Sequence, residues 1–353
     1  MNPMPYMEWA KLRSTARFNL ATSGLTMYPL RELPVRIEEL EITGPGLYGY
    51  PELRERLVRK TGASEESLVL SIGTSMANFI ALGALIERGD DVLIEQPTYQ
   101  PMLHIAQWLG ANVRRFLRDP ANEWNIDIDK LRDAVRPNTK LIVLSNLHNP
   151  SSALITENEM RDIGAIGPRV FVDEVYLEAM FDWPQRSAFF LGDNFTITNS
   201  LTKAYGLSGL RCGWILTQPE LVSRMHALVD LTYGVMAHSA ERLSVIALDH
   251  LPKITQCAHD LLEKNRKLVN TFLAAHEQQL ECAPGEFGIC VAPRLRSGRV
   301  EEFCEVLRHK FETSVVPGHF FEAPEHFRIG LGGPTDILAE GLERIASALK
   351  GLR

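Results

Sequence analysis

The chain reads Ser200-Leu-Thr-Lys203-Ala-Tyr-Gly-Leu-Ser-Gly-Leu-Arg211-Cys-Gly-Trp214 directly after a short β-branched run at residues 195–199, which predicts a strand. A hydroxyl stands three residues before the lysine, and an arginine stands eight residues after it. A lysine amine attacks a carbonyl once its pKa is lowered, and a guanidinium binds phosphate through two parallel donors. Together the two cations could hold a phosphorylated aldehyde. They are also compatible with a solvent-exposed, glycine-rich turn.

Short apolar runs alternate with longer amphipathic stretches around this motif, as is typical of repeated strand–helix–strand units. Seven runs predict strands, at residues 67–72, 91–95, 113–116, 140–145, 169–173, 195–199 and 212–217. Helices are predicted between them, at residues 76–86, 102–109, 128–135 and 157–166. The sequence therefore predicts an α/β fold with a seven-stranded, mostly parallel sheet covered by helices.

The two ends of the chain have other patterns. Residues 1–43 are irregular and interrupted by four prolines, so we expect an N-terminal arm associated with a small domain. Residues 44–245 contain the predicted sheet and should form a large domain. A helical stretch at 219–275 leads out of it, and residues 246–353 should form a smaller α+β domain. Its predicted elements are strands near 288–292, 314–316 and 327–331 and helices at 300–310 and 336–349.

Composition restricts the kind of ligand. The 353 residues are 45% hydrophobic and carry a formal charge of −7, which suits a folded core but not a protein that neutralises nucleic-acid phosphates. The five cysteines form no Cys-x-x-Cys pair, and no apolar run is long enough for a signal peptide or a membrane span. We therefore expect a cytoplasmic protein with a small-molecule ligand, no nucleic-acid or membrane partner and no metal site.

Ligands of parallel α/β sheets bind beyond the carboxyl ends of the strands. The predicted strands end in five loops that carry polar side chains, namely residues 73–75, 97–99, 146–150, 173–176 and 200–211. The first, Gly73-Thr74-Ser75, opens a helix, so its N–H groups and hydroxyls are suited to bind an anion. Ser75 could equally be an ordinary helix cap.

The motif at 200–214 resembles the cofactor-lysine signature of fold-type-I, class I/II aminotransferases, which use pyridoxal 5′-phosphate (PLP). Two further motifs follow the order found in that family. The stretch Asn146-Leu-His-Asn149-Pro150-Ser151-Ser152 is similar to its Asn-Pro-x-Gly-like loop, and Asp173-Glu-Val-Tyr176 is similar to its Asp-Glu-x-Tyr. The resemblance extends over about residues 44–332 and implies the PLP transferase fold of type I, with residues 44–245 as the cofactor-binding domain.

The resemblance implies a role for each residue of these motifs. Lys203 would hold PLP as a Schiff base, and Asp173 would pair with the protonated ring nitrogen, making the ring an electron sink. Tyr176 and Asn149 would hydrogen-bond the phenolate oxygen of the cofactor. Thr74, Ser75, Ser200 and Arg211 would bind its phosphate, and Tyr99 would stack on its ring. Asp173 as a helix cap, Asn149 as a turn residue and the two tyrosines as packing residues are the alternatives.

Three further residues match the family outside these motifs. Tyr48, in Gly44-Pro-Gly-Leu-Tyr48, is similar to a tyrosine that reaches the phosphate from the neighbouring subunit, which implies a homodimer with shared active sites. Arg328 resembles the arginine that grips the substrate's α-carboxylate, and Gly24 lies in a segment similar to the one that covers the substrate. Asn149 would also contact the substrate. No family role attaches to His148, which we interpret as a structural loop histidine.

The implied function is transfer of an amino group between an amino acid and a 2-oxo acid with ping-pong kinetics, Lys203 being the acid and base. The same residues serve PLP-dependent carbon–sulfur lyases, cyclopropane-forming synthases and cyclising enzymes, because all begin by removing the Cα proton. That group is the alternative. Related acyltransferases carry histidine where this chain has Tyr176. A non-catalytic regulatory homologue is less favoured, because such proteins carry an extra DNA-binding segment for which 353 residues leave little room. A structural or inactive homologue is less favoured because the PLP-binding residues are present.

Overall fold

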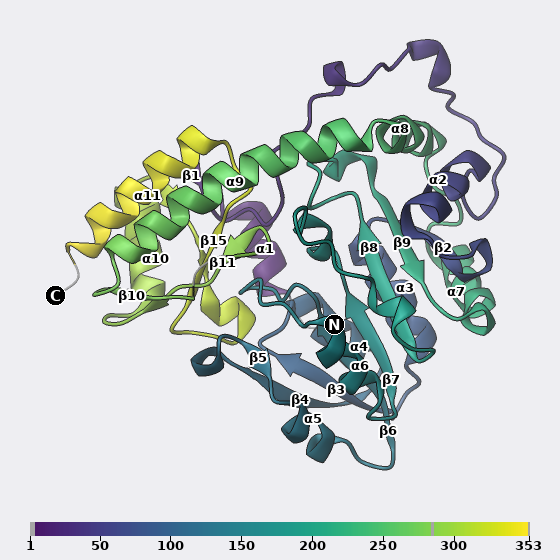
Figure 1. Ribbon diagram of the computed structural model, residues 1–353, viewed down its shortest axis with the longest axis horizontal. Coiled ribbons are helices and arrows are strands. Elements are labelled where there is room, and N and C mark those ends of the chain that lie inside the picture. The colour runs from purple at the N-terminus through teal and green to yellow at the C-terminus, as the bar shows by residue number, and fades with distance from the viewer. Residues whose placement is uncertain (1–3, 284–285, 352–353) are drawn as a thin grey trace.

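Eight strands form one central sheet in the computed structural model, which describes residues 4–283 and 286–351. In spatial order they are β2 (Leu68–Ile72), β9 (Cys212–Leu216), β8 (Phe195–Ser200), β7 (Arg169–Asp173), β6 (Thr139–Ser145), β3 (Asp91–Gln96), β4 (Asn112–Asp119) and β5 (Asn125–Ile126). Strands β8, β7, β6, β3 and β4 run parallel, whereas β9 is antiparallel to both its neighbours. All seven predicted strands are confirmed, and the short β5 is an addition (Figure 1).

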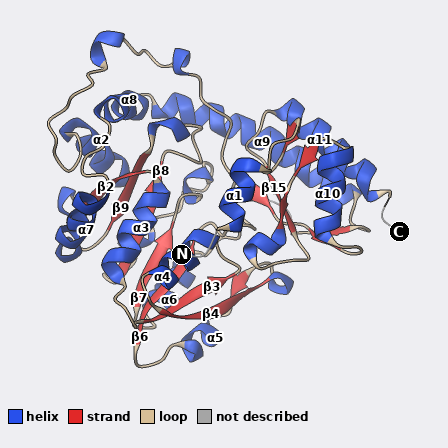
Figure 2. Ribbon diagram, turned by 180° about the vertical axis from the view of Figure 1, so that it is seen from behind, coloured by secondary structure: helices blue, strands red, loops and turns tan. Residues whose placement is uncertain are grey.

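Alternate residues of the strands pack into two different cores, which is why the strands read as continuous apolar runs. Val92 and Ile94 of β3 pack with the helices of one face, whereas Leu93 between them belongs to the core on the other face. The first face is covered by α3 (Thr74–Leu85), α4 (Gln100–Trp108) and α7 (Pro219–Thr232). The second is covered by α2 (Pro51–Thr61), α5 (Ile128–Ala134), α6 (Glu157–Gly164) and α8 (His238–Asp249). Figure 2 shows the strands as a layer with helices on both sides.

A single long helix, α9 (Leu251–Ala275), leads from the sheet to the C-terminal part of the chain (Figure 1). That part contains the short strands β10 (Leu280–Glu281), β11 (Cys290–Val291), β12 (Arg294–Leu295), β13 (Thr313–Ser314), β14 (Val316–Pro317) and β15 (Phe327–Gly330). Two helices, α10 (Val300–Lys310) and α11 (Thr335–Leu349), complete it. Within the described residues no helix joins the length and the apolar character that crossing a membrane demands.

The N-terminal arm is more regular than the sequence indicated. It contains the helix α1 (Pro5–Leu12), because Pro5 stands at the first helical position, where a missing N–H costs nothing. The strand β1 (Phe18–Asn19) pairs in parallel with β13, so the two ends of the chain share a small sheet. This pairing supports grouping the arm with the small domain, whereas the boundaries 1–43, 44–245 and 246–353 stay predictions.

Candidate active site

A cavity of about 410 Å³ lies beyond the carboxyl ends of the parallel strands, where the loops were expected to meet. Most of the predicted site residues line it: Gly24, Thr74, Ser75, Tyr99, Asn149, Asp173, Tyr176, Lys203 and Arg211. The arm contributes further lining residues from α1 and from the segment 21–25. Residues from three distant parts of the sequence therefore enclose one space.

Lys203 faces the cavity with a partly exposed side chain. Its Nζ donates a hydrogen bond to Ser23 Oγ at 3.0 Å. Burial lowers the pKa of this amine and the positive charge of Arg328 adds to the effect, while Asp173 opposes both, so that the pKa is about 8. Roughly a tenth of the amine is therefore unprotonated at neutral pH and available as a nucleophile or base.

Asp173 ends β7 with its side chain buried at the cavity wall. Asn78 Nδ2 donates to its Oδ2 at 2.8 Å, and the N–H of Val175 donates to its Oδ1 at 3.1 Å. Burial raises the pKa of Asp173, and these hydrogen bonds counteract the rise. The carboxylate is thus held in place by neutral donors while a cation on the cavity side would stabilise its charge.

Asn78 was missed by the sequence analysis. It lies on α3 with 1% of its surface exposed, and Thr198 Oγ1 donates to its Oδ1 at 2.6 Å. That contact leaves the Asn78 amide oriented with its N–H groups toward Asp173. The sequence did contain a signal for Asn78, because it is a polar residue on the apolar face of the helix that begins at Thr74.

The N-terminus of α3 forms an anion-binding corner. The N-cap residue Gly73 has no side chain with which to cap this helix, so the first N–H groups are suited to bind a ligand. Thr74 Oγ1 donates to Ser200 Oγ at 2.7 Å, and Arg211 Nη2 donates to the carbonyl of Ile72 at 3.1 Å. A Cβ at Gly73 would lie 2.4 Å from Arg211 Nη2, so glycine is required for the guanidinium to come this close.

Two tyrosines bound the cavity. Tyr176 is buried, which raises its pKa well above the usual range, so the phenol is neutral and can donate a hydrogen bond. Tyr99 stands edge-on to Tyr6 of α1, with 6.2 Å between the ring centroids. Its hydroxyl contacts Met7 Sδ at 3.6 Å. The helix α1 therefore packs against the aromatic wall of the cavity.

Arg328 is placed differently from the expectation. Its side chain is 1% exposed and lies behind the cavity wall, where Nη1 donates to Asn149 Oδ1 at 2.9 Å. Its Nη2 donates to Tyr6 Oη and to the carbonyl of Ala21, both at 3.0 Å. Among the described residues Nε has no partner. A substrate carboxylate would have to replace these hydrogen-bond partners of Arg328. Of the three partners, Tyr6 is the residue that lies on the separate helix α1.

Tyr48 lies outside this cavity. Its ring stacks on His226 with 3.9 Å between centroids, and its hydroxyl donates to Asp230 Oδ2 at 2.8 Å. The side chain is exposed. The structure therefore does not bring Tyr48 together with the other predicted site residues of its own chain.

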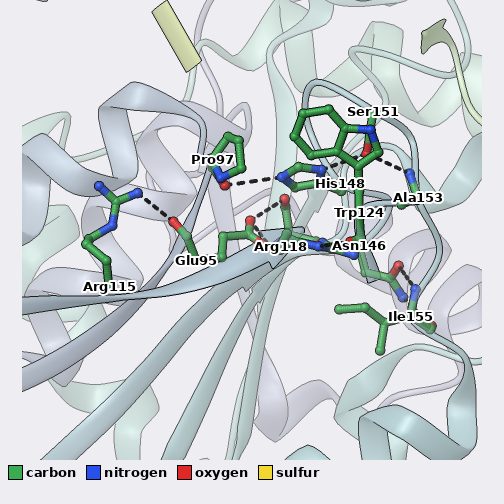
Figure 3. A network of polar contacts seen from close by, with 11 residues as sticks. Glu95, Pro97, Arg115, Arg118, Trp124, Asn146, His148, Ser151, Ala153 and Ile155 are labelled. Atoms are coloured by element: carbon green, nitrogen blue, oxygen red, sulfur yellow. Dashed lines mark hydrogen bonds and ion pairs between the residues drawn. The ribbon is translucent and has the colours of Figure 1, made fainter. Parts of the chain in front are cut away.

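A buried ion pair supports the loop that carries Asn149 (Figure 3). Arg118 Nη1 lies 3.1 Å from Glu95 Oε2, and both side chains are fully buried. Ser145, which lines the cavity, donates to Glu95 from its N–H at 2.8 Å and its hydroxyl at 2.6 Å. Arg118 also donates to the carbonyls of Trp124 and Ser145. The pair thereby fixes the end of β6, where the loop begins.

His148 belongs to the same support. Its Nε2 donates to the carbonyl of Pro97 at 3.2 Å, so Nδ1 accepts from Ser151 Oγ at 2.7 Å. Burial and the charge of Arg118 keep the pKa of His148 well below its usual value, so the ring is neutral. It is not among the lining residues of the cavity, in keeping with a structural loop histidine.

A sequence profile for aminotransferases of class I and II matches residues 41–345. The chain belongs to this family. Members use pyridoxal phosphate, so the chain is a PLP-dependent enzyme. Capreomycidine synthase of Streptomyces vinaceus is 28% identical, over 98% of this chain and 93% of that protein. An aspartate aminotransferase of Rhizobium meliloti is 28% identical over 87% of this chain and 81% of its own.

The fold agrees with this assignment. A PLP-dependent aminotransferase from Streptococcus suis 89-1591 superposes with a TM-score of 0.94 at 24% identity, covering 100% of this chain and 98% of that one. The aminotransferase cavity also fits its cofactor chemically. Among the described residues the buried Asp173 has no cationic hydrogen-bond partner, the N-terminus of α3 with Arg211 suits a phosphate, and Lys203 offers an amine in the same cavity.

Loss of Arg118 should destabilise this enzyme strongly. Arg118→Met leaves Glu95 buried without its cation, which should cost about 3–5 kcal/mol in the free energy of unfolding. Burial already raises the pKa of Glu95 to about 7 despite Arg118, so the variant's pKa lies higher. An acid with a raised folded-state pKa loses stability as pH rises from its unfolded to its folded pKa, so the variant should go on losing stability above about pH 7, where the wild type no longer does.

Urea unfolding followed by circular dichroism measures this effect. Arg132→Met is the matched control, because Arg132 pairs with Asp129 on the surface and its loss should change stability by less than about 1 kcal/mol. A deficit in Arg118→Met no larger than that of the control would contradict a stabilising role for the buried pair.

The lowered pKa of Lys203 should be measurable in the cofactor-free enzyme. Acylation by acetic anhydride requires the neutral amine, so its rate at Lys203, followed by peptide mass spectrometry, should reach half its maximum near pH 8. The exposed Lys130 should need a higher pH. Asp173→Asn should move the Lys203 midpoint downward, because the charge of Asp173 raises this pKa. A Lys203 midpoint equal to that of Lys130 would refute the assignment.

Proposed function

We propose that the chain is an aminotransferase that moves an amino group between an amino acid and a 2-oxo acid, with Lys203 as the catalytic base and acid. The observation that carries the proposal is one cavity containing an amine with a pKa of about 8, a buried carboxylate and an anion-binding helix terminus. When bound, pyridoxal phosphate supplies an aldehyde carbon that condenses with amines and a ring that takes up the electrons left by Cα deprotonation.

In this proposal the predicted residues divide the work of holding the cofactor. Asp173 would hold the ring nitrogen, Tyr99 the ring face, and Tyr176 and Asn149 the phenolate oxygen. The phosphate would be bound by Thr74, Ser75, Ser200 and Arg211. Ser200 lies behind Thr74 and is fully buried, so it would act by orienting the Thr74 hydroxyl as well as by direct contact. The remaining cavity, bounded by α1 and Gly24, would receive the substrate.

Lys203 has the features that a proton-transfer group needs. Its Nζ would take the proton from Cα of the substrate and return it to the cofactor-side carbon, which is a 1,3-shift by one group. A pKa near the working pH favours both halves of that cycle. Arg328 would bind the α-carboxylate after Tyr6 yields its hydrogen bond, and Asn149 would keep the guanidinium oriented.

A cyclising or lyase activity is the second candidate. The relative that covers 98% of this chain is called a synthase rather than an aminotransferase. Both reaction types share the first proton transfer, so the residues at Lys203 do not separate them. They differ in what becomes of the amino group, which is not left on the cofactor in the second case.

We further propose a homodimer with shared active sites in the cytoplasm. The exposed position of Tyr48 outside its own cavity supports a site completed by a neighbouring subunit. All five cysteines are free, as expected in a reducing compartment.

Covalent attachment at Lys203 and amino transfer can be tested together. Borohydride reduction of the PLP-loaded enzyme should fix the cofactor on the Lys203 peptide, as detected by mass spectrometry. Lys203→Ala should abolish this label and lower turnover by roughly 10²–10⁴-fold, whereas Lys130→Ala should do neither. An amino acid added alone should release one 2-oxo acid per site and leave pyridoxamine phosphate. A cyclised or cleaved product with unchanged cofactor would instead support the second candidate.

The carboxylate role of Arg328 gives a separate prediction. Arg328→Lys keeps the charge but loses the paired donors, so KM for the amino acid should rise roughly 10–100-fold while kcat changes little. Tyr6→Phe should lower KM or leave it unchanged, because the substrate no longer competes with the Tyr6 hydroxyl for Arg328. Steady-state kinetics measure both. An unchanged KM in Arg328→Lys would exclude this arginine as the carboxylate site.

A further inference from the structure

The hydroxyl of Ser23 is the hydrogen-bond acceptor of the Lys203 amine, at 3.0 Å. In the part of the chain that the structure describes, the amine has no second hydrogen-bond acceptor. Ser23 lies in the N-terminal arm, 180 residues from Lys203 in sequence, and lines the cavity. A residue of the arm is thus in direct contact with the atom that carries the proposed proton transfer.

The backbone on either side of Ser23 is fixed in position. The N–H of Leu25 donates to the carbonyl of Lys203 itself at 2.9 Å, and the N–H of Thr26 donates to that of Gly332 at 2.6 Å. On the other side the carbonyl of Leu20 accepts from Gly330 at 2.7 Å. The arm is therefore bound to the Lys203 loop two residues after Ser23, and small changes in the arm cannot carry the hydroxyl away from the amine.

Close packing confirms that the arm has little freedom here. A Cβ at Gly332 would lie 2.3 Å from the carbonyl oxygen of Gly24, so only glycine admits the arm at this point. A Cβ at Gly24 would lie 3.4 Å from Cδ of Lys203. The lysine side chain consequently runs alongside the arm, and its amine ends at the hydroxyl of Ser23.

Tyr176, a second predicted site residue, lines the same cavity as Ser23. Burial raises the pKa of Tyr176 well above its usual range, and a hydrogen bond with Ser23 is one of the smaller effects that oppose the rise. Ser23 and Tyr176 both line the cavity that Lys203 faces. The 3.0 Å hydrogen bond from the amine places the Ser23 hydroxyl within the reacting part of this cavity.

We infer that Ser23 is a positioning residue, whose hydroxyl orients the Lys203 amine for proton transfer. A hydroxyl both accepts and donates, so it accepts from the protonated amine and donates to the neutral one. A carboxylate at this place would favour the charged amine alone. Ser23 thus holds Nζ in the same position in both protonation states through which an acid–base group must pass.

The inference rests on the proposed role of Lys203, and the expected effect is on the chemical step. Misplacing a reacting group by about 1 Å costs roughly 10²-fold in rate. Ser23→Ala should therefore lower kcat about 10–100-fold with a change in KM below about threefold. The isotope effect of Cα-deuterated substrate on kcat should increase, because the proton transfer becomes more rate-limiting. Ser23→Thr keeps the hydroxyl and should retain most of the activity.

The control is Ser347→Ala, which removes an exposed hydroxyl that donates to the Glu343 carbonyl of its own helix and should leave every parameter unchanged. If Ser23→Ala does not fold, Ser23→Cys replaces it, since a thiol is a weak donor of similar size. Unchanged kcat and isotope effect in the alanine variant would overturn the inference. Equal losses in the alanine and threonine variants would do the same, because they would indicate a packing role.

Acylation of Lys203 in the cofactor-free protein separates this inference from the proposed function. The hydroxyl binds both forms of the amine, but a hydrogen bond from the charged form is the stronger. Its loss in Ser23→Ala should therefore speed the acylation of Lys203 at neutral pH by about threefold, relative to Lys130. A changed acylation rate in Ser23→Ala, in a protein that shows no amino transfer, would contradict the proposed function but support the Ser23–Lys203 contact. Amino transfer by the wild type, with an acylation rate in Ser23→Ala equal to that of the wild type, would support the proposed function but contradict the role of Ser23.

Discussion

The active site is organised around the buried carboxylate of Asp173 at the end of β7. A carboxylate removed from water is unfavourable without compensation, and here two neutral donors, from Asn78 and Val175, supply only part of it. The sheet accordingly presents this group to the cavity, with the Lys203 amine as a neighbouring cation. Because Asn78 belongs to α3 and Thr198 to β8, the requirement to stabilise one charge ties together three elements of the fold.

Local sequence predicted the sheet and the residues at its edge, because both depend on short-range patterns. Strand ends, turn residues and the loop that precedes Arg211 are encoded within a few positions, and these are the places where the predicted residues meet. Ser23 and Tyr6 could not be assigned in this way. Their partners, Lys203 and Arg328, lie 180 and 322 residues away, and nothing in the arm's own pattern identifies which loop it will contact.

Arg328 is a second residue whose surroundings could not be predicted from its local sequence. Its sequence context was recognised, but its exposure depends on Tyr6. Tyr6 lies on α1, a helix that was not predicted because the arm contains several prolines. The proline at the start of α1 is a helix-initiating residue, which a pattern of scattered prolines does not distinguish from a helix-breaking one. The substrate side of the cavity is therefore set by the arm, whereas the cofactor side is set by the sheet.

The helix α9 connects the sheet, which forms the cofactor side of the cavity, to the part of the chain that pairs with the arm. At 25 residues it is a rigid rod of roughly 37 Å, with one end beside the sheet and the other beside α10 and α11 (Figure 1). A tilt of only about 5° at the sheet end would swing the far end through roughly 3 Å, about the length of a hydrogen bond. Through β13, β1 and Gly330 the same swing would pull on the arm, and the hydrogen bond from Leu25 to the carbonyl of Lys203 would oppose the movement.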